Sequence, residues 1–311
     1  MNKSPTIGFI GFGEAGFELA RGLRAAGIEN IFFCRLHRGD PQREALALRR
    51  SNESGAGALD SAGDVAARSD YILSVVPPEA ALAAVESAVP SLGPGKVYLD
   101  LTSSSPEEMR HAARLVEAAG AAFVDGVMTG SLPIEGYKVL TYLSGHEAEG
   151  VAQRLNGYGM NLRVAGREPG QASAIKLILS VATKGLESLL VEMLLAAHHF
   201  RVEDEVLQGL DRFFALGLER VVNRFVGSDA VYAGRRAREM EAAVSLLEKL
   251  GIEPLMARAT VQRLRWSDSL GLSAKFGGVP PAGYREVIQA WEEIGLFKTH
   301  KEINPKSKEG R

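Results

Sequence analysis

The sequence is poor in cysteine, in long apolar runs and in net charge, and each shortage excludes a class of protein. Its 311 residues include one cysteine, Cys34, which excludes an internal disulfide and a cysteine-ligated zinc site. Lysine and arginine number 36 and aspartate and glutamate 38, so no global field favours nucleic acid. No apolar run reaches the ~18 residues of a membrane span, and the start, MNKSPT, contains no signal-peptide core. We expect a soluble, cytoplasmic protein without a metal, nucleic-acid or membrane partner.

Residues 6–27 predict a strand, a glycine turn and a helix. Residues 7–10 are apolar and suit a strand buried on both faces. Gly11, Gly13 and Gly16 follow in the spacing G-x-G-x-x-G, and apolar residues then recur at helical intervals. Such a turn allows a sharp bend, a close approach of backbone N–H groups to a pyrophosphate and close packing of helix on strand. We therefore predict that a dinucleotide is bound by Gly11, Phe12, Gly13, Glu14, Ala15 and Gly16.

The end of the second predicted strand, residues 30–34, decides between NAD and NADP. An acidic residue there would hold the adenosine ribose of NAD, whereas an arginine would accommodate the 2′-phosphate of NADP. The segment reads Arg35-Leu36-His37-Arg38, and the first acid is Asp40. The sequence therefore favours NADP, with NAD possible, and a solvated basic loop is the alternative interpretation of these cations.

Further strands are predicted at 71–76, 97–101, 121–125 and 139–144, separated by helices that include 41–50, 79–89 and one beginning after Ser105. Ser105 and Glu108 have the spacing of a capping box. The carboxyl ends of parallel strands form the edge where such sheets bind ligands. We therefore expect four residues that follow two of these strands to line the cofactor: Val76, Pro77, Thr102 and Ser103.

From residue 169 onward the pattern changes to long helices, predicted at 172–200, 203–216, 230–250, 255–270 and 284–294. The sequence thus predicts an α/β protein with a Rossmann-type, doubly wound, mainly parallel sheet over 1–166 and an all-α domain over 167–311. The helix at 172–200 is apolar on nearly all sides, so it needs to be buried on all of them. We expect a second copy of the chain to cover it, in a homodimer.

Lys176 is the candidate acid/base. It lies one turn into the long helix among apolar residues, and burial disfavours the charged form of a lysine. A neutral amine suits proton transfer at a carbinol. Ser180, Thr183 and Lys184 share its helical face, and Lys184 would further disfavour the charged form. The alternative is a lysine that extends to solvent.

A candidate substrate site follows the strand at 121–125. Thr129, Gly130 and Ser131 offer two hydroxyls and adjacent backbone N–H groups, which suit a carboxylate. The same residues are also common in ordinary turns.

Four segments, in order along the chain, resemble motifs of the β-hydroxyacid dehydrogenase superfamily, which includes 3-hydroxyisobutyrate and 6-phosphogluconate dehydrogenases. Residues 7–16 are similar to its dinucleotide fingerprint, and residues 100–106 to its D-x-S-T-x-x-P segment beside the nicotinamide. Residues 125–131 resemble the substrate motif D-A-P-V-S-G-G. Residues 170–176 resemble G-x-G-x-x-x-K, whose lysine is the catalytic acid/base. The resemblance implies an NADP-preferring oxidoreductase acting on a 3-hydroxy acid or related small carboxylate, with Lys176 as acid/base.

The chain departs from the family pattern after that lysine. Leu179 and Ser180 stand where the family has asparagines, and phosphogluconate enzymes have histidine at the first of these positions. Leu179 therefore argues against that substrate, and the chain resembles a less characterised branch. Its cluster Arg235, Arg236 and Arg238 is either a solvated helix face or a contact to an acidic substrate across a dimer. An imine reductase of similar architecture, which usually lacks this lysine, and a cofactor-binding sensor without turnover remain alternatives.

Overall fold

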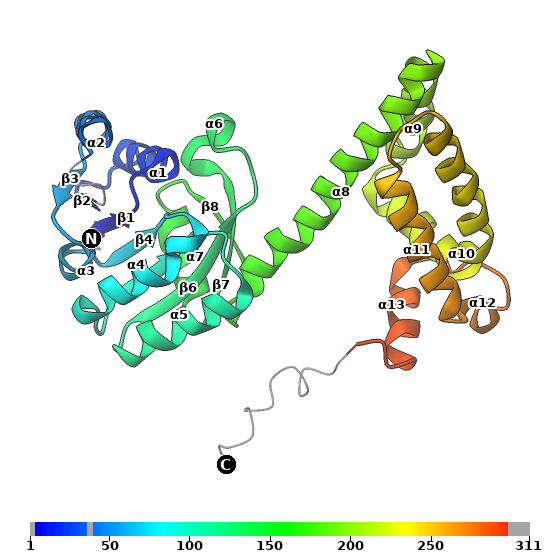
Figure 1. Ribbon diagram of the computed structural model, residues 1–311. Coiled ribbons are helices and arrows are strands. Elements are labelled where there is room, and N and C mark those ends of the chain that lie inside the picture. The colour runs from blue at the N-terminus through cyan, green and yellow to red at the C-terminus, as the bar shows by residue number, and fades with distance from the viewer. Residues whose placement is uncertain (1–3, 36–39, 298–311) are drawn as a thin grey trace. The chain divides into compact units, whose positions relative to one another are not determined.

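The computed structural model describes residues 4–35 and 40–297, which belong to two compact units, Met1–Ala182 and Thr183–Arg311. The first unit contains an eight-stranded sheet with helices on both faces, and the described part of the second is helical (Figure 1). This confirms the predicted α/β class with an all-α C-terminal part. The two units divide within helix α8 (Gln171–Phe200), and the predicted domain boundary after residue 166 stays a prediction.

The sheet has the order β3-β2-β1-β4-β5-β6-β7-β8, with β6 and β7 antiparallel and the other neighbours parallel. Each strand predicted from the sequence is present. The bounds are β1 (Ile7–Ile10), β2 (Ile31–Cys34), β3 (Gly57–Leu59), β4 (Tyr71–Ser74), β5 (Val97–Asp100), β6 (Ala122–Met128), β7 (Leu140–Ser144) and β8 (Asn161–Gly166). The chain order reverses between β1 and β4, so the crevice at their carboxyl ends is the expected ligand site of the sheet.

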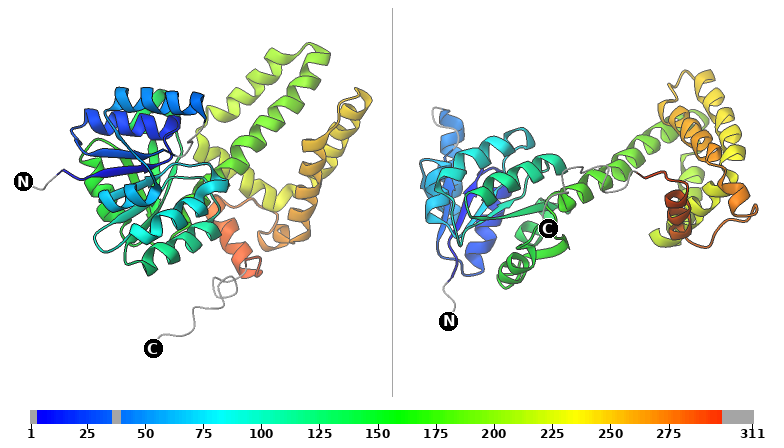
Figure 2. Two further views of the ribbon diagram at one scale, coloured as in Figure 1. Left: turned by 60° about the vertical axis from the view of Figure 1, so that its left-hand side comes forward. Right: turned by 90° about the horizontal axis from the view of Figure 1, so that it is seen from below.

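Two apolar clusters lie in the first unit, one on each face of the sheet, beneath the helices that cover that face in Figure 2. Phe9 belongs to the cluster beneath α1, α2 and α7, whereas its neighbour Ile10 belongs to the one beneath α3, α4 and α5. Successive side chains of a strand point to opposite faces, which is why a strand buried on both faces is apolar throughout. The helices are α1 (Glu14–Ala25), α2 (Pro41–Ser54), α3 (Ala62–Arg68), α4 (Ala81–Ala88), α5 (Pro106–Ala118), α6 (Leu132–Glu135) and α7 (Ala148–Asn156), with 3-10 turns at Pro78–Ala80, Val89–Ser91 and Gly136–Lys138.

The structure confirms one local prediction and adds one strand that was not predicted. Helix α5 begins with the predicted capping box: Glu108 N–H donates to Ser105 Oγ at 3.2 Å, and Ser105 N–H donates to Glu108 Oε2 at 2.8 Å. Strand β8 was not predicted, because the side chains at 163–165 are exposed and give no buried apolar pattern.

The described part of the second unit contains the rest of α8 and further helices. Their bounds are α9 (Glu203–Phe214), α10 (Leu218–Lys249), α11 (Leu255–Ser269), α12 (Leu272–Lys275) and α13 (Tyr284–Glu293). Helix α10 begins earlier than the predicted residue 230, because Gly227 does not interrupt it. A Cβ at Gly227 would lie 2.7 Å from the Pro281 carbonyl oxygen, so this glycine allows a close backbone approach. Within the described residues, no helix has both the length and the apolarity to cross a membrane.

Candidate functional site

The three fingerprint glycines have the geometry that a dinucleotide turn requires. Gly11 has φ +96°, and a Cβ there would lie 2.6 Å from the Val75 carbonyl oxygen. A Cβ at Gly16 would overlap the Gly11 carbonyl oxygen, so α1 packs closely on β1. A Cβ at Gly13, by contrast, would meet nothing within 4 Å. The turn therefore has one open side, at the N-terminus of α1, where backbone N–H groups favour a pyrophosphate.

The residues that follow β4 lie beside this turn, and the contact of Val76 and Pro77 with the cofactor stays a prediction. Val75 N–H donates to the Ile10 carbonyl oxygen at 2.8 Å, and Val76 Cγ1 lies 3.1 Å from the position of a Cβ on Gly11. Val76 is buried and Pro77 is exposed. Val76 therefore forms part of the wall of the turn, and Pro77 lies on its solvent side.

The loop after β5 is tied to the loop after β4. Thr102 is buried, and its Oγ1 lies 3.1 Å from Ser104 Oγ, which donates to the Pro78 carbonyl oxygen at 3.3 Å. The hydroxyl of Thr102 is thus buried and hydrogen-bonded within the protein. Ser103 is only half-buried. Of the two hydroxyls predicted to contact the cofactor, that of Ser103 is the more accessible.

The predicted determinant of cofactor choice, Arg35, has an acidic partner. Arg35 forms an ion pair with Asp60, which follows β3, and both side chains are exposed. A 2′-phosphate at Arg35 would share the guanidinium with this carboxylate. The predicted contributions of Leu36, His37 and Arg38 lie outside the described residues.

A buried carboxylate fixes the start of α8. Asp125 Oδ2 accepts hydrogen bonds from Ser144 Oγ at 3.0 Å, Gly170 N at 2.9 Å and Ser173 N at 3.0 Å, and Oδ1 accepts one from Ser173 Oγ at 2.6 Å. Ser144 Oγ in turn accepts from Ala172 N at 3.0 Å. The first N–H groups of a helix lack intrahelical partners, and a carboxylate there is stabilised by the helix dipole. Asp125 therefore anchors α8 to the sheet.

Asp125 belongs to a row of polar side chains that crosses the sheet. Ser74, Asp100, Asp125 and Ser144 are register partners on β4, β5, β6 and β7. All four are fully buried. Asp100 Oδ1 accepts a hydrogen bond from Thr102 N at 2.8 Å, and burial raises the pKa of Asp100 to about 7. The Asp125 carboxylate accepts four hydrogen bonds, whereas Asp100 Oδ1 accepts one from Thr102 N.

Lys176 lies three residues beyond the anchored Ser173 and is half-buried. Ser180 follows it on the same helical face and is also half-buried, whereas Thr183 and Lys184 are exposed. The anchor at Asp125 and the helix together bring Lys176 close to the carboxyl edge of the sheet, one helical turn from the anchored residues.

The predicted carboxylate-binding turn already holds a carboxylate of the chain. Ser131 N–H donates to Glu135 Oε1 at 2.7 Å, at the start of α6. Thr129 N–H and Oγ1 both donate to the Leu140 carbonyl oxygen, at 2.8 and 3.2 Å. The turn is thus able to bind a carboxylate, but a substrate that used Ser131 N–H would have to displace Glu135.

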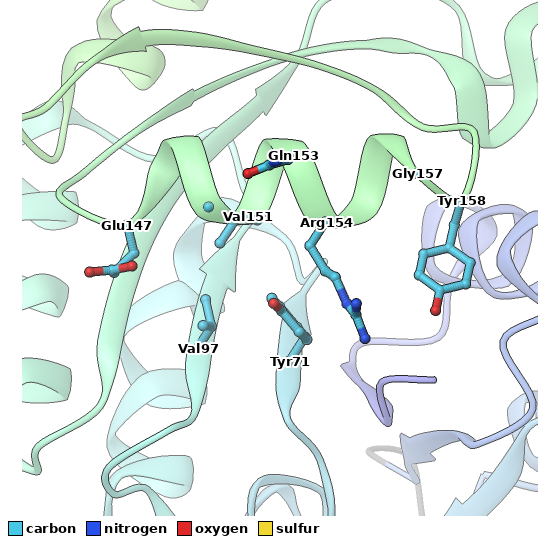
Figure 3. A pocket seen from close by; sticks show the side chains of 9 residues that line it. Tyr71, Val97, Glu147, Val151, Gln153, Arg154, Gly157 and Tyr158 are labelled. Carbon is cyan, nitrogen blue, oxygen red and sulfur yellow. The ribbon is translucent and has the colours of Figure 1, made fainter. Parts of the chain in front are cut away.

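A cavity of about 820 Å³ lies at the opposite edge of the sheet (Figure 3). Tyr71 and Val97, the first residues of β4 and β5, line it together with Arg154 and Tyr158, and the side chain of Arg154 lies beside that of Tyr71. Burial raises the pKa of Tyr71. This cavity is separate from the glycine turn, which follows the carboxyl end of β1. Residues 4–35 and 40–297 contain no cluster of three or more metal-ligating side chains.

No role was predicted from the sequence for Asp125, Glu135, Asp60 or Arg50; Arg50 contacts the glycine turn from α2. One signal was available for Asp125: a carboxylate inside a buried strand needs several hydrogen-bond donors. The other three lie on exposed or amphipathic segments, where nothing in the pattern distinguishes them from solvated residues.

Two family models match the chain. Residues 6–156 match the NAD binding domain of 6-phosphogluconate dehydrogenase, and residues 197–267 match a domain of unknown function, DUF1932. A conserved protein of unknown function, with reported structural similarity to 3-hydroxyacid dehydrogenases, is 33% identical, with a TM-score of 0.59 over 86% of this chain and 98% of its own.

Two further relatives are more distant. The mitochondrial 3-hydroxyisobutyrate dehydrogenase of Drosophila melanogaster is 28% identical over 46% of this chain, and the match spans 43% of that enzyme. An imine reductase from Myxococcus stipitatus in complex with NADP+ has a TM-score of 0.68 at 20% identity, over 86% of this chain and 96% of its own. At that identity the likeness concerns the fold alone.

Proposed function

Because the chain belongs to the 3-hydroxyacid dehydrogenase-like family of NAD(P)-binding proteins, we propose that it transfers hydride between NADP and a 3-hydroxy acid or related small carboxylate. Family membership supports a dehydrogenase or reductase, and the open side of the glycine turn fits a dinucleotide. The observation that carries the proposal is the position of Lys176, one helical turn beyond the residues that Asp125 anchors.

In the proposed reaction, Lys176 takes the proton of the substrate hydroxyl while the hydrogen on the same carbon leaves as hydride, and it returns the proton in reduction. The bound nicotinamide supplies the hydride acceptor or donor. Ser180 and Thr183 orient the lysine or the substrate oxygen, and Lys184 favours the neutral form of Lys176.

The other end of the substrate is proposed to lie at the turn after β6. Thr129, Gly130 and Ser131 hold the carboxylate. The contact between Ser131 N–H and Glu135 supports this role, because it shows that the turn accepts a carboxylate.

The second candidate is an imine reductase, which the shared fold favours and Lys176 opposes, since such enzymes usually lack a lysine there. The third is a cofactor-binding sensor without turnover. A panel of short hydroxy acids and cyclic imines, each with NADP(H) and NAD(H), separates the three by turnover and thermal shift. We expect NADPH formation with at least one hydroxy acid. Reduction of imines alone would support the second candidate, and cofactor binding without turnover of any compound would support the third.

We also propose that the protein is a homodimer. Large apolar side chains are exposed along α8 and α9, among them Leu186, Leu189, Val191, Leu195, Leu207 and Phe214. Many large apolar side chains exposed along two helices are unusual for a monomer and support an interface with another chain. Sedimentation at micromolar concentration should give a dimer, and a monomer would contradict the proposal.

A further inference from the structure

Arg50 reaches the glycine turn from α2. Its Nη1 donates to the Phe12 carbonyl oxygen at 3.0 Å, and its guanidinium carbon lies 5.7 Å from the centre of the Phe17 ring. The ring of Phe12 stacks on Phe33 at 4.0 Å. Arg50 is half-buried, so its guanidinium is held between a carbonyl and an aromatic face. The dinucleotide fingerprint does not include this residue.

The contact determines the direction of one peptide group. In a trans peptide the C=O of one residue and the N–H of the next point in opposite directions. The carbonyl of Phe12 points to Arg50, so the N–H of Gly13 points away from Arg50. A Cβ at Gly13 would meet nothing within 4 Å, so this residue borders the open side of the turn.

We propose that Arg50 is a positioning residue for the cofactor pyrophosphate, because it holds the Phe12–Gly13 peptide with its N–H toward the phosphates. Phe12 lies between two glycines, and glycine restricts the backbone dihedral angles less than other residues do. Stacking on Phe33 fixes the side chain of Phe12, and Arg50 fixes its carbonyl. The guanidinium also places a positive charge behind the turn, which favours an anion on its open side.

This role differs from that of Arg35 in its effect on the two cofactors. The pyrophosphate is common to NAD and NADP, so loss of Arg50 should weaken both alike. Loss of Arg35 should weaken NADP alone, because the 2′-phosphate is its expected ligand. The inference rests on dinucleotide binding by the family and not on the proposed substrate, so failure of the hydroxy-acid panel leaves its test intact.

The test compares Arg50→Met with Arg49→Met by calorimetric titration of NADP+, NAD+ and 2′-AMP at one ionic strength. Arg49 is the matched control: it is exposed, lies on the same helix and pairs with Glu53 at 3.7 Å, away from the turn. Arg50→Met should weaken NADP+ and NAD+ equally, by about tenfold, the effect of one charge-assisted hydrogen bond. Binding of 2′-AMP, which has no pyrophosphate, should be unchanged, and Arg49→Met should bind all three ligands like the unaltered protein.

Three results would overturn the proposal: unchanged binding of both dinucleotides, a loss confined to NADP+ and 2′-AMP, or an equal loss in Arg49→Met. The first would mean that the turn does not depend on Arg50, the second that Arg50 contacts the 2′-phosphate, and the third that only bulk charge matters. If Arg50→Met lowers the melting temperature of the cofactor-free protein, Arg50→Lys replaces it, with Arg49→Lys as control. The lysine keeps the charge and the apolar stem but lacks the guanidinium fork, so an equal loss for both dinucleotides is again expected.

Discussion

The β1–α1 turn and the start of α8 are both required for the proposed reaction, but they are held in different ways. The turn is formed by backbone approaches, with Gly16 against Gly11 and Gly11 against Val75. The start of α8 is held by one buried side chain, Asp125, which receives four hydrogen bonds. One region thus depends on the absence of side chains and the other on the presence of a charge.

This difference implies that cofactor binding and turnover can be altered separately. Changes around the turn should act on the dissociation constants of NADP+ and NAD+. Changes at Asp125 or along α8 should act on turnover, because these residues lie on the proposed substrate side. The following substitutions test this separation.

The largest effect is expected from Lys176→Ala, which should lower kcat by ~10²–10⁴-fold, the usual contribution of a general acid/base. The dissociation constant of NADP+ should stay nearly unchanged, because the glycine turn is untouched. Lys184→Ala is the comparison variant: Lys184 is exposed, so a smaller loss is expected. If Lys184→Ala were inactive and Lys176→Ala kept most of its rate, the wrong lysine would have been chosen.

Asp125→Asn should weaken the anchor of α8 while keeping the shape of the side chain. It removes the charge that four donors share, and we expect the free energy of unfolding to fall by about 2 kcal/mol. Because Lys176 would then be less well placed, kcat should fall at least about tenfold. Denaturant unfolding and steady-state rates measure the two effects. Wild-type kcat in this variant would show that the anchor does not position the lysine.

Arg35→Asp should weaken NADP+ binding by about tenfold or more, because a charge-assisted contact to the 2′-phosphate is lost. NAD+ binding should not weaken, because an acid at this position can hold the adenosine ribose. Titration of both cofactors measures this. Asp60→Asn, which removes the acidic partner of Arg35, should strengthen NADP+ binding. The cofactor assignment would be wrong if the unaltered protein bound NADH more tightly than NADPH.

The smallest expected effect is a pH dependence of stability that arises from Asp100. Burial raises its pKa from 3.8 to about 7, so the folded protein retains a proton that the unfolded chain releases. The stabilisation from this group is therefore fully present below pH 3.8 and is lost as the pH rises to about 7. Asp100→Asn, which cannot ionise, should lose less stability than the unaltered protein between pH 5 and pH 8. If the free energy of unfolding fell equally with pH in the two proteins, Asp100 would not be the cause of the pH dependence.

The sequence predicted the cofactor side of the site more completely than the substrate side. Gly11, Gly13 and Gly16 could be predicted as a dinucleotide turn from their spacing together with the strand before them and the helix after them, because few arrangements of strand, turn and helix use glycines in this way. The contacts of Asp125 with residues 170–173 could not be predicted, because they join segments far apart in the chain. Nor could the contact of Glu135 with Ser131 N–H, because the short helix α6 gives too little periodicity for a prediction.

The most direct test of the account uses a hydroxy acid identified by the panel, with deuterium on the carbon that bears the hydroxyl. If the protein transfers hydride from that carbon, the NADPH formed from NADP+ carries one deuterium, as mass spectrometry or NMR of the cofactor would show. NADPH without deuterium would contradict the account, because the hydride would then have come from another atom.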